Sequence, residues 1–264
     1  MPELPEVEAL VRDLSALTSG QRVSSIQLGA IAALKTFDPG LADLEGQAIA
    51  GWRRRGKFVV WELESVAMVI HLGRAGWVRW HDRVPPERAK GAPGKAPPAP
   101  SRPKLGRGPL ALRVVLDHGG ALDVTEMGHE KHLAIWILND ADQLPQLARL
   151  GPDPLDPAFD VAGLAALARA STFNLKTFLT RQEVMAGVGN AYSDEALHAA
   201  RLSPFKSAAR LSDEELVRLH HALVGVLTDA VARSVGLSAG DLKSEKKRSM
   251  RVHGRTGQAC PVCG

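Results

Sequence analysis

The sequence has few cysteines and no long apolar stretch, and both absences narrow the class of protein. Cys260 and Cys263 are the two cysteines among 264 residues. Two cysteines cannot form the disulfide framework of a small secreted domain, so we expect a cytoplasmic protein. No apolar run reaches the length of a membrane span, and the acidic N-terminus lacks the basic and apolar regions of a signal peptide. We therefore expect neither a membrane protein nor a secreted scaffold.

Basic charge is concentrated in two segments of the chain. The net charge is +4, yet residues 85–109 contain six basic residues against Glu87, and residues 240–264 contain six against Asp241 and Glu245. The rest of the chain is therefore acidic, apart from a short basic cluster at residues 53–57. Charge concentrated in this way suits a polyanion such as nucleic acid. Solvated flexible loops would have the same composition, so charge alone leaves both interpretations open.

The order of the local patterns predicts an α+β fold with two main domains. Apolar residues recur at helical spacing after Pro5, which predicts a helix that begins near this proline. Four short apolar segments predict strands, and His118–Gly120 predicts a hairpin turn before the last of them. These strands are expected at Lys57–Leu63, Ala67–Leu72, Leu110–Leu116 and Ala121–Thr125. Residues 85–109 contain eight prolines and are expected to form a mobile insertion.

The second half of the chain is predicted to be helical. The proline-rich break at Gly151–Pro157 marks the predicted domain boundary. Ser212 and Glu215 have the spacing of a capping box and precede a periodic apolar run that starts at Leu216. A helix is also expected over Ala191–Ala200.

Two short stretches could carry chemistry. The chain opens MPELPEVE, with Pro2 beside three carboxylates, although acidic residues near a helix start are also common as simple helix caps. In MAGVGNAYSDE, Gly187 and Gly189 predict a tight turn and Asn190 is a candidate cap for the following helix. Backbone N–H groups at such a helix start can bind phosphate. The spacing differs from that of a dinucleotide-binding fingerprint, and taken alone the stretch also fits an ordinary helix–turn–helix corner.

Taken together and in this order, the motifs resemble those of the formamidopyrimidine-DNA glycosylase / endonuclease VIII family. The matching stretches are Met1–Glu8, Arg55–Phe58, His71–Gly76, Ala186–Tyr192 and Val252–Cys263. The resemblance implies an N-terminal β-sandwich-like catalytic domain with flanking helices over residues 1–150. It further implies a helical domain with a helix–two-turn–helix motif over 151–244 and the first half of a zinc finger over 245–264. The implied partner is double-stranded DNA with damaged bases or abasic sites, bound by a monomeric, nucleoid-associated bacterial protein.

The resemblance also implies a bifunctional DNA glycosylase and abasic-site lyase of base-excision repair. Once Met1 is removed, Pro2 has a free amine, and an α-amino group has an ordinary pKa near ~8. The neutral amine would attack C1′ of the damaged nucleotide, release the base and leave an iminium adduct from which β,δ-elimination proceeds. Glu3 is implied as the general acid/base. Lys57 would contact a phosphate near the lesion and assist the elimination, although a lysine whose stem lies on the protein surface is the alternative.

Further residues are implied around the bound DNA. Glu6 would orient the amine and the nearby backbone. Because the damaged base must leave the helix to reach Pro2, other residues must fill the gap that it leaves. The implied DNA contacts are His71, Arg74, Lys176, Gly189, Asn190 and Arg255. His71 could instead be an ordinary core histidine with its hydrogen bonds satisfied.

The sequence departs from the family pattern in two regions. Arg74 stands where a methionine often fills the gap, and the loop over residues 125–132 replaces the usual arginine and phenylalanine. Other residues of this loop could fill the gap by different contacts: Met127, His129, Lys131 and His132. The loop that caps 8-oxoguanine in some members would fall near residues 238–250 and is short and basic here. These changes favour an alternative function, a DNA-binding protein that recognises damaged or abasic DNA without efficient turnover.

The second departure concerns zinc. A finger of this type uses two C-x2-C pairs, and this sequence contains only the pair Cys260 and Cys263. Zinc is therefore a cofactor implied by the resemblance, with two of four ligands present. We accordingly expect residues 240–264 to be flexible.

Overall fold

The structure is a computed structural model that describes residues 1–84, 109–260, 262 and 264. The predicted insertion over 85–109 lies outside the described residues except for Pro109, and so does Cys263. Contacts divide the chain into two compact units. The first contains Met1, Leu14–Trp52 and Val60–Ala141, and the second contains Pro2–Asp13, Arg53–Val59 and Asp142–Gly264. The first helix, α1 (Leu4–Thr18), thus begins in the second unit and ends in the first.

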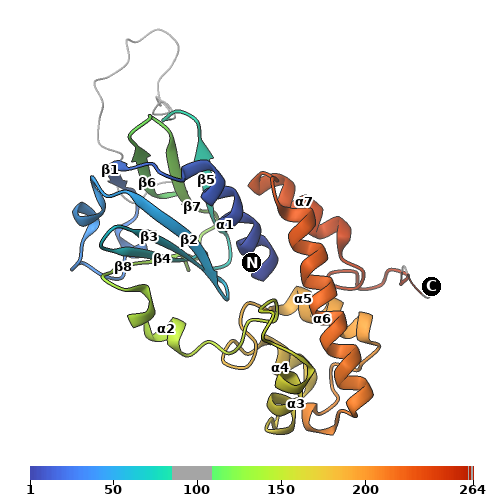
Figure 1. The fold of residues 1–264 in the computed structure, drawn as a ribbon. Coiled ribbons are helices and arrows are strands. Elements are labelled where there is room, and N and C mark those ends of the chain that lie inside the picture. Colours follow the sequence, from blue (N-terminus) through green and yellow to red (C-terminus); the bar gives the residue numbers. More distant parts are fainter. Residues whose placement is uncertain (85–108, 261, 263) are drawn as a thin grey trace. The chain divides into compact units, whose positions relative to one another are not determined.

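The N-terminal half of the chain contains two four-stranded sheets, which belong to the first unit except for the end of β2 and the start of β3 (Figure 1). One sheet has the order β1-β6-β7-β5, in which each neighbouring pair is antiparallel, and the other has the order β2-β3-β4-β8. The strands are β1 (Val23–Leu28), β2 (Ile49–Arg55), β3 (Phe58–Leu63), β4 (Ala67–His71), β5 (Gly76–His81), β6 (Leu110–Leu116), β7 (Ala121–Glu126) and β8 (Ala134–Leu138). Short 3-10 helices lie at Ile31–Ala33, Leu41–Leu44 and Ala141–Gln143.

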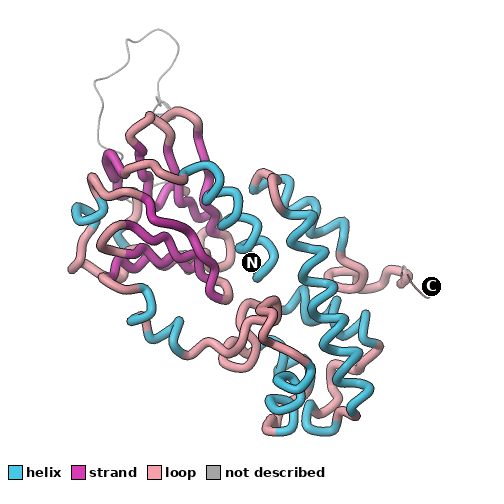
Figure 2. The backbone as a smooth tube through the Cα atoms, in the orientation of Figure 1, coloured by secondary structure: helices cyan, strands magenta, loops and turns pink. Residues whose placement is uncertain are grey.

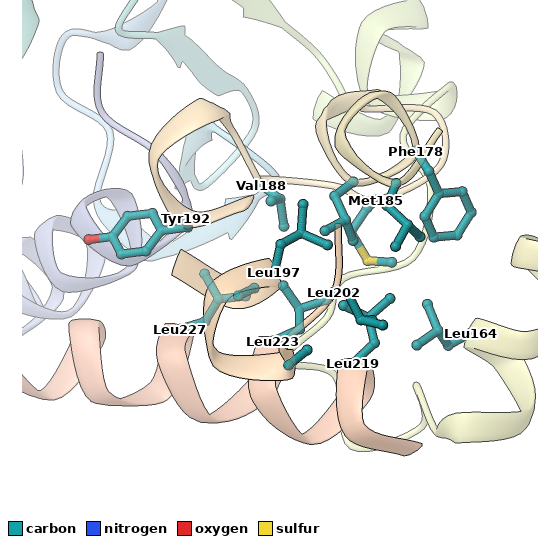
Figure 3. Close-up of a cluster of buried hydrophobic side chains, with 14 of the residues drawn as sticks. Leu164, Phe178, Met185, Val188, Tyr192, Leu197, Leu202, Leu219, Leu223 and Leu227 are labelled. Carbon is teal, nitrogen blue, oxygen red and sulfur yellow. The ribbon is translucent and has the colours of Figure 1, made fainter. Parts of the chain in front are cut away.

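Helices dominate the second unit, as the colouring in Figure 2 shows. They are α2 (Pro145–Ala148), α3 (Val161–Arg169), α4 (Leu175–Thr180), α5 (Asn190–Ala200), α6 (Asp213–Ser234) and α7 (Ala239–Ser249), with a 3-10 turn at Ala208–Arg210. Apolar residues at helical spacing on α6 pack against the side chains of α3, α4 and α5 to form one core (Figure 3). Leu4, at the start of α1, is fully buried in this same core. The beginning of the chain is therefore part of the second unit's interior.

The predicted α+β class is confirmed, with strands in the N-terminal half and helices in the C-terminal half. The four predicted strands are present within one residue of their expected ends. The predicted capping box is also present, because Ser212 accepts a hydrogen bond from the N–H of Glu215 and the Glu215 side chain accepts one from the N–H of Ser212. No helix in the described part of the chain is long and apolar enough to cross a membrane.

Residues 238–250 were expected to form a short basic loop, but they form a helix with its caps. In this helix, α7, the Ser238 side chain accepts a hydrogen bond from the N–H of Asp241. The helix is held by the buried side chain of Leu242 and is followed by the buried Met250. Two apolar anchors and a cap are enough to order a segment whose other side chains are mostly charged.

Candidate active site

The backbone beside Pro2 is fixed on both sides of Glu3. The N–H of Leu4 donates to the carbonyl of Gly187 at 3.0 Å, and the N–H of Glu3 donates to Glu6 Oε2 at 2.8 Å. Pro2 itself is half-buried, whereas Met1 is exposed. The start of the chain is thus held on the turn that precedes α5, and its second residue remains partly accessible.

The carboxylate of Glu3 caps the N-terminus of α5. It accepts hydrogen bonds from the backbone N–H groups of Gly189 at 2.8 Å, Ala191 at 3.0 Å and Tyr192 at 3.3 Å. A negative charge at the positive end of a helix is stabilised by the helix dipole. The expectation that Asn190 caps this helix is therefore wrong: Asn190 is its first residue, and a carboxylate from the start of the chain supplies the acceptor. Gly189 leaves the space for it, because a Cβ there would lie 2.5 Å from Glu3 Cδ.

Glu6 is held by three donors from different elements. Its Oε2 accepts from the N–H of Glu3 and from Lys246 Nζ, each at 2.8 Å, and its Oε1 accepts from the hydroxyl of Tyr192. Burial, followed by the charge of Glu6, raises the pKa of Tyr192, so this hydroxyl stays protonated and remains a donor. Figure 3 shows the Tyr192 ring at one end of the helical core with its hydroxyl pointing away from that core. Glu6 thus holds the backbone next to Pro2, and its part in orienting the amine stays a prediction.

Lys57 follows a tight turn that packs against the same region. Gly56 has φ +57°, and a Cβ there would lie 3.2 Å from Leu150 Cδ1 and 3.4 Å from the backbone nitrogen of Gly187. Lys57 is only 7% exposed, and no hydrogen bond or ion pair within the described residues holds its ammonium group. Burial lowers the pKa of Lys57, Glu3 opposes this change, and the charge of Lys246 adds to it. Among the described residues, Lys57 is therefore a buried lysine whose ammonium group has no hydrogen-bonded partner, and the charges of Glu3 and Glu6 act on it.

A buried arginine fixes the strand end that precedes Lys57. Arg54 contacts Glu8 of α1 at 2.8 Å and also forms an ion pair with Asp153, and its side chain is 7% exposed. Burial alone would raise the pKa of Glu8, but hydrogen bonds from Arg54 and Arg12 hold this pKa below its ordinary value. The network connects the end of β2 with α1 and with the loop before α3, and so it supports the turn that carries Lys57.

The residues expected to grip phosphates lie around the start of α5. Lys176 Nζ donates to the carbonyl of Asn190 at 2.7 Å and to Ser193 Oγ at 2.8 Å, and it also pairs with Asp194. The side chain of Asn190 is exposed. The N–H of Gly189 is donated to Glu3, and Lys176 Nζ donates to three acceptors around the start of α5, so a phosphate would have to replace one of these contacts. Phosphate binding by these residues stays a prediction.

The residues expected to fill the gap in the DNA belong to the first unit. Arg74 is exposed and pairs with Glu130 at 2.9 Å, while His71 Nδ1 accepts the N–H of Gly73 at 3.3 Å. The loop after β7 is held by the buried carboxylate of Glu126, which accepts the N–H groups of His132 at 2.6 Å and Leu133 at 2.9 Å. Other candidates on this loop are exposed, including Met127, His129 and His132.

The segment that follows α7 is anchored by another buried carboxylate. Glu195 of α5 accepts the backbone N–H groups of Arg251 at 2.8 Å and of Val252 and His253 at 2.9 Å each. The flexibility expected for residues 240–264 does not apply to α7 or to residues 251–253, which are held by the helix and by these three hydrogen bonds. Arg255 follows directly and is half-buried.

Zinc binding by Cys260 and Cys263 stays a prediction. Cys260 Sγ lies 3.4 Å from His198 Nε2, and no group of three or more His, Cys, Asp or Glu side chains in the described ranges is arranged to hold a metal ion. The second expected ligand, Cys263, lies outside those ranges. No step of the chemistry below depends on a metal.

Sequence reasoning missed three residues that build the site: Tyr192, Glu195 and Lys246. Tyr192 and Glu195 stand within the quoted glycine-rich stretch, but their partners are distant in sequence and no local pattern identifies them. Lys246 could have been placed on a helix, because Ser238 and Asp241 have the spacing of an N-terminal cap. Its contact with Glu6 had no sequence signal.

Comparisons with known proteins identify the family. Residues 1–125 match the model of the formamidopyrimidine-DNA glycosylase N-terminal domain, and residues 150–239 match that of the formamidopyrimidine-DNA glycosylase H2TH domain. The formamidopyrimidine-DNA glycosylase of Moorella thermoacetica is 36% identical over 279 aligned positions, which cover 100% of this chain and 92% of that protein.

Solved structures give the same result. The MutM (Fpg) protein of Thermus thermophilus superposes with a TM-score of 0.78 at 33% identity, covering 100% of this chain and 91% of the other. The Lactococcus lactis formamidopyrimidine-DNA glycosylase, bound non-covalently to DNA that contains an abasic site, has a TM-score of 0.78 at 26% identity and covers 99% of this chain and 91% of its own. The chain belongs to the formamidopyrimidine-DNA glycosylase family.

Proposed function

We propose that this protein is a bifunctional DNA glycosylase and abasic-site lyase of base-excision repair that uses the amine of Pro2 as its nucleophile. The observation that carries the proposal is the cluster at the start of the chain. Buried Glu3 adjoins the half-buried Pro2, buried Glu6 holds the N–H of Glu3, and no hydrogen bond or ion pair in the described part of the chain holds the buried Lys57. Buried charged groups without a structural partner are rare outside functional sites. The Lactococcus lactis relative was solved with abasic-site DNA, which supports damaged duplex DNA as the ligand.

The chemistry requires Pro2 to be the first residue, so that its nitrogen is an amine and not an amide. The amine lone pair forms a bond to C1′ of the damaged nucleotide, and the bond from C1′ to the base breaks with its electron pair on the base. The proton of the attacking amine passes to the departing base. Glu3 supplies the proton that opens the sugar ring at its oxygen, which leaves an iminium ion. Loss of a C2′ proton then moves electrons into the iminium, and the C3′–O bond breaks. A second elimination breaks the C5′–O bond.

Each residue of the cluster has a part in this sequence of steps. Glu6 holds the N–H of Glu3 and thereby the backbone next to Pro2. The ammonium group of Lys57, which has no hydrogen-bonded partner in the described ranges, can pair with a phosphate of the bound strand, and this contact stabilises the charge on the leaving phosphate. Lys176, Asn190 and Arg255 would add contacts to flanking phosphates, and His71 and Arg74 would act from the first unit.

Borohydride trapping tests the proposal. Protein whose N-terminus is verified by mass spectrometry to be Pro2 is mixed with a duplex that contains an abasic site, and borohydride reduces the iminium to a stable protein–DNA adduct. The matched control is the same protein with Met1 retained, which converts the amine into an amide without changing the core. We expect the adduct only with the processed protein, and equal binding of both proteins to undamaged DNA. Trapping that is undiminished with Met1 fully retained would contradict the assignment of Pro2.

The same experiment distinguishes the alternative function. A processed protein that binds abasic DNA tightly but forms no adduct would be a damage-recognition protein without turnover. A panel of duplexes with 8-oxoguanine, formamidopyrimidine or an oxidised pyrimidine then identifies the preferred lesion.

A further inference from the structure

Lys246 extends from α7 into the cluster around Glu6. Its Nζ lies 2.8 Å from Glu6 Oε2, 3.9 Å from Glu3 Oε1 and 4.5 Å from the centre of the Tyr192 ring. Its side chain is 20% exposed, whereas the neighbouring Lys247 and Arg248 are exposed. The Lys246 side chain thus extends from α7 to the cluster around Glu6, unlike those of Lys247 and Arg248.

The fold does not depend on this lysine to attach α7. Leu242 and Met250 are buried, Ser238 caps the helix, and Arg233 of α6 pairs with Glu245 at 3.5 Å. Placing an ammonium group in a largely buried position costs free energy that an apolar side chain would not. A charged side chain that lies in this position despite the cost indicates a functional role in the cluster around Glu6.

The geometry shows what the charge does to Glu6. One oxygen, Glu6 Oε2, accepts from Lys246 and from the N–H of Glu3, and the other accepts from Tyr192. With three donors, from the backbone just before α1, from α5 and from α7, the carboxylate is held in one arrangement. Since the N–H of Glu3 is one of these donors, the arrangement also fixes the peptide group next to Pro2.

Two carboxylates and two ammonium groups lie together in the cluster next to Pro2, and Lys246 supplies one of the ammonium groups. The carboxylates of Glu3, which precedes α1, and of Glu6, on α1, are opposed by the ammonium groups of Lys57 and Lys246. Tyr192 on α5 stays neutral, while Arg233 on α6 is paired with Glu245 and Asp229. Two carboxylates alone would stabilise a protonated amine at Pro2, which cannot act as a nucleophile. The second lysine offsets that effect.

We propose that Lys246 is a positioning residue of the catalytic cluster, which fixes Glu6 through an ion pair and supplies a positive charge that favours the neutral, reactive form of the Pro2 amine. The inference rests on the proposed function, because it concerns the state of the proposed nucleophile. The effect of Lys246 on the pKa of Lys57 shows that its charge is felt across the cluster.

The test is the pH profile of single-turnover trapping. Processed wild-type protein, Lys246→Met, Lys246→Arg and the control Lys247→Met are compared in excess over an abasic-site duplex, at DNA concentrations that saturate binding. Lys246 Nζ is one hydrogen bond from Glu6, which in turn holds the N–H next to Pro2. Loss of this nearby charge should move the acidic limb of the Lys246→Met profile up by about one pH unit, which is roughly a tenfold slower rate on that limb. Lys246→Arg, which keeps the charge, should retain the wild-type limb, and Lys247→Met should superpose on wild type.

Other outcomes would overturn the inference. Two results would show that Lys246 is only a structural contact. One is an acidic limb in Lys246→Met at the same pH as in wild type. The other is an equal loss of rate at every pH in both the Met and Arg variants. Lys246→Gln, which keeps a donor without the charge, replaces Lys246→Met if circular dichroism shows the latter to be unfolded, and it should show the same shift. Absence of trapping in the wild type itself would overturn the proposed function, and this inference with it, whereas failure in the variants alone leaves the proposed function intact.

Discussion

Lys57 is the residue at which folding and the proposed chemistry have opposite requirements. Its ammonium group is buried and has no partner within the described residues. We expect Lys57→Met to raise the free energy of unfolding at pH 7 by roughly 1 kcal/mol, because the apolar side chain needs no hydration. The same change should slow strand cleavage at an abasic site. Urea unfolding and a gel assay for cleavage measure the two effects, with the exposed Lys243→Met as control.

The gain in stability should depend on pH in a defined direction. Burial lowers the pKa of Lys57 in the folded state, so the unfolded chain binds this proton more tightly. The unfavourable contribution is fully present below the folded-state pKa and disappears as the pH rises toward the unfolded value of about 10.4. The stability difference between Lys57→Met and wild type should therefore shrink between neutral pH and pH 10. A difference that grows with pH would contradict the assignment of a buried, charged lysine.

Gly189 leaves the space that the carboxylate of Glu3 occupies at the start of α5. A Cβ at this position would lie 2.5 Å from Glu3 Cδ, so Gly189→Ala must displace the carboxylate from the start of α5. Loss of a positioned general acid should reduce trapping by about a hundredfold. Gly225→Ala is the matched control, because nothing lies within 4 Å of a Cβ there and Gly225 is within α6. The control should fold with equal or greater stability and trap normally.

At the scale of elements, the strands and long helices could be predicted because their signals are local. Alternating and periodic apolar residues gave β3, β4, β6, β7 and α6 almost to the residue. Apolar periodicity could not predict helix α7, because most of its side chains are charged and its burial depends on Leu242 and on the following Met250. The cap of α5 was assigned wrongly for a related reason: its acceptor, Glu3, lies 186 positions from Gly189 in sequence. Local patterns predict elements, whereas the contacts that complete the site join elements distant in the chain.

The link between α5 and the segment after α7 gives a prediction at this scale. Glu195→Ala leaves three backbone N–H groups without their acceptor, and each unsatisfied group in a buried site costs roughly 1–3 kcal/mol unless water replaces the carboxylate. Amide exchange of residues 251–253 should accelerate, while the core of α6 stays protected. Glu214→Ala, an exposed carboxylate at the start of α6, is the control. Unchanged exchange at residues 251–253 would show that Glu195 does not anchor the segment.

At the scale of the whole molecule, the uneven charge should control the affinity for undamaged DNA. The net charge of +4 is the sum of two basic segments and an otherwise acidic chain. Binding through such segments is electrostatic, so the affinity should fall linearly with the logarithm of salt concentration, with a slope of about −0.9 per phosphate neutralised. The expected loss is independent of sequence, because phosphate contacts position a protein on DNA without reading its bases.

Arg251 and Arg255 test this expectation in the described part of the basic C-terminal segment. Changing both to Gln should reduce the salt slope by about 0.9 for each phosphate contact that is lost, and should weaken binding to damaged and undamaged duplexes by the same factor. Fluorescence anisotropy between about 50 and 200 mM salt measures the slope. Arg210→Gln removes an exposed positive charge elsewhere on the helical unit and should leave the slope unchanged. A double variant that keeps the wild-type slope but loses only damaged-DNA binding would show that these arginines recognise the lesion and not the phosphate backbone.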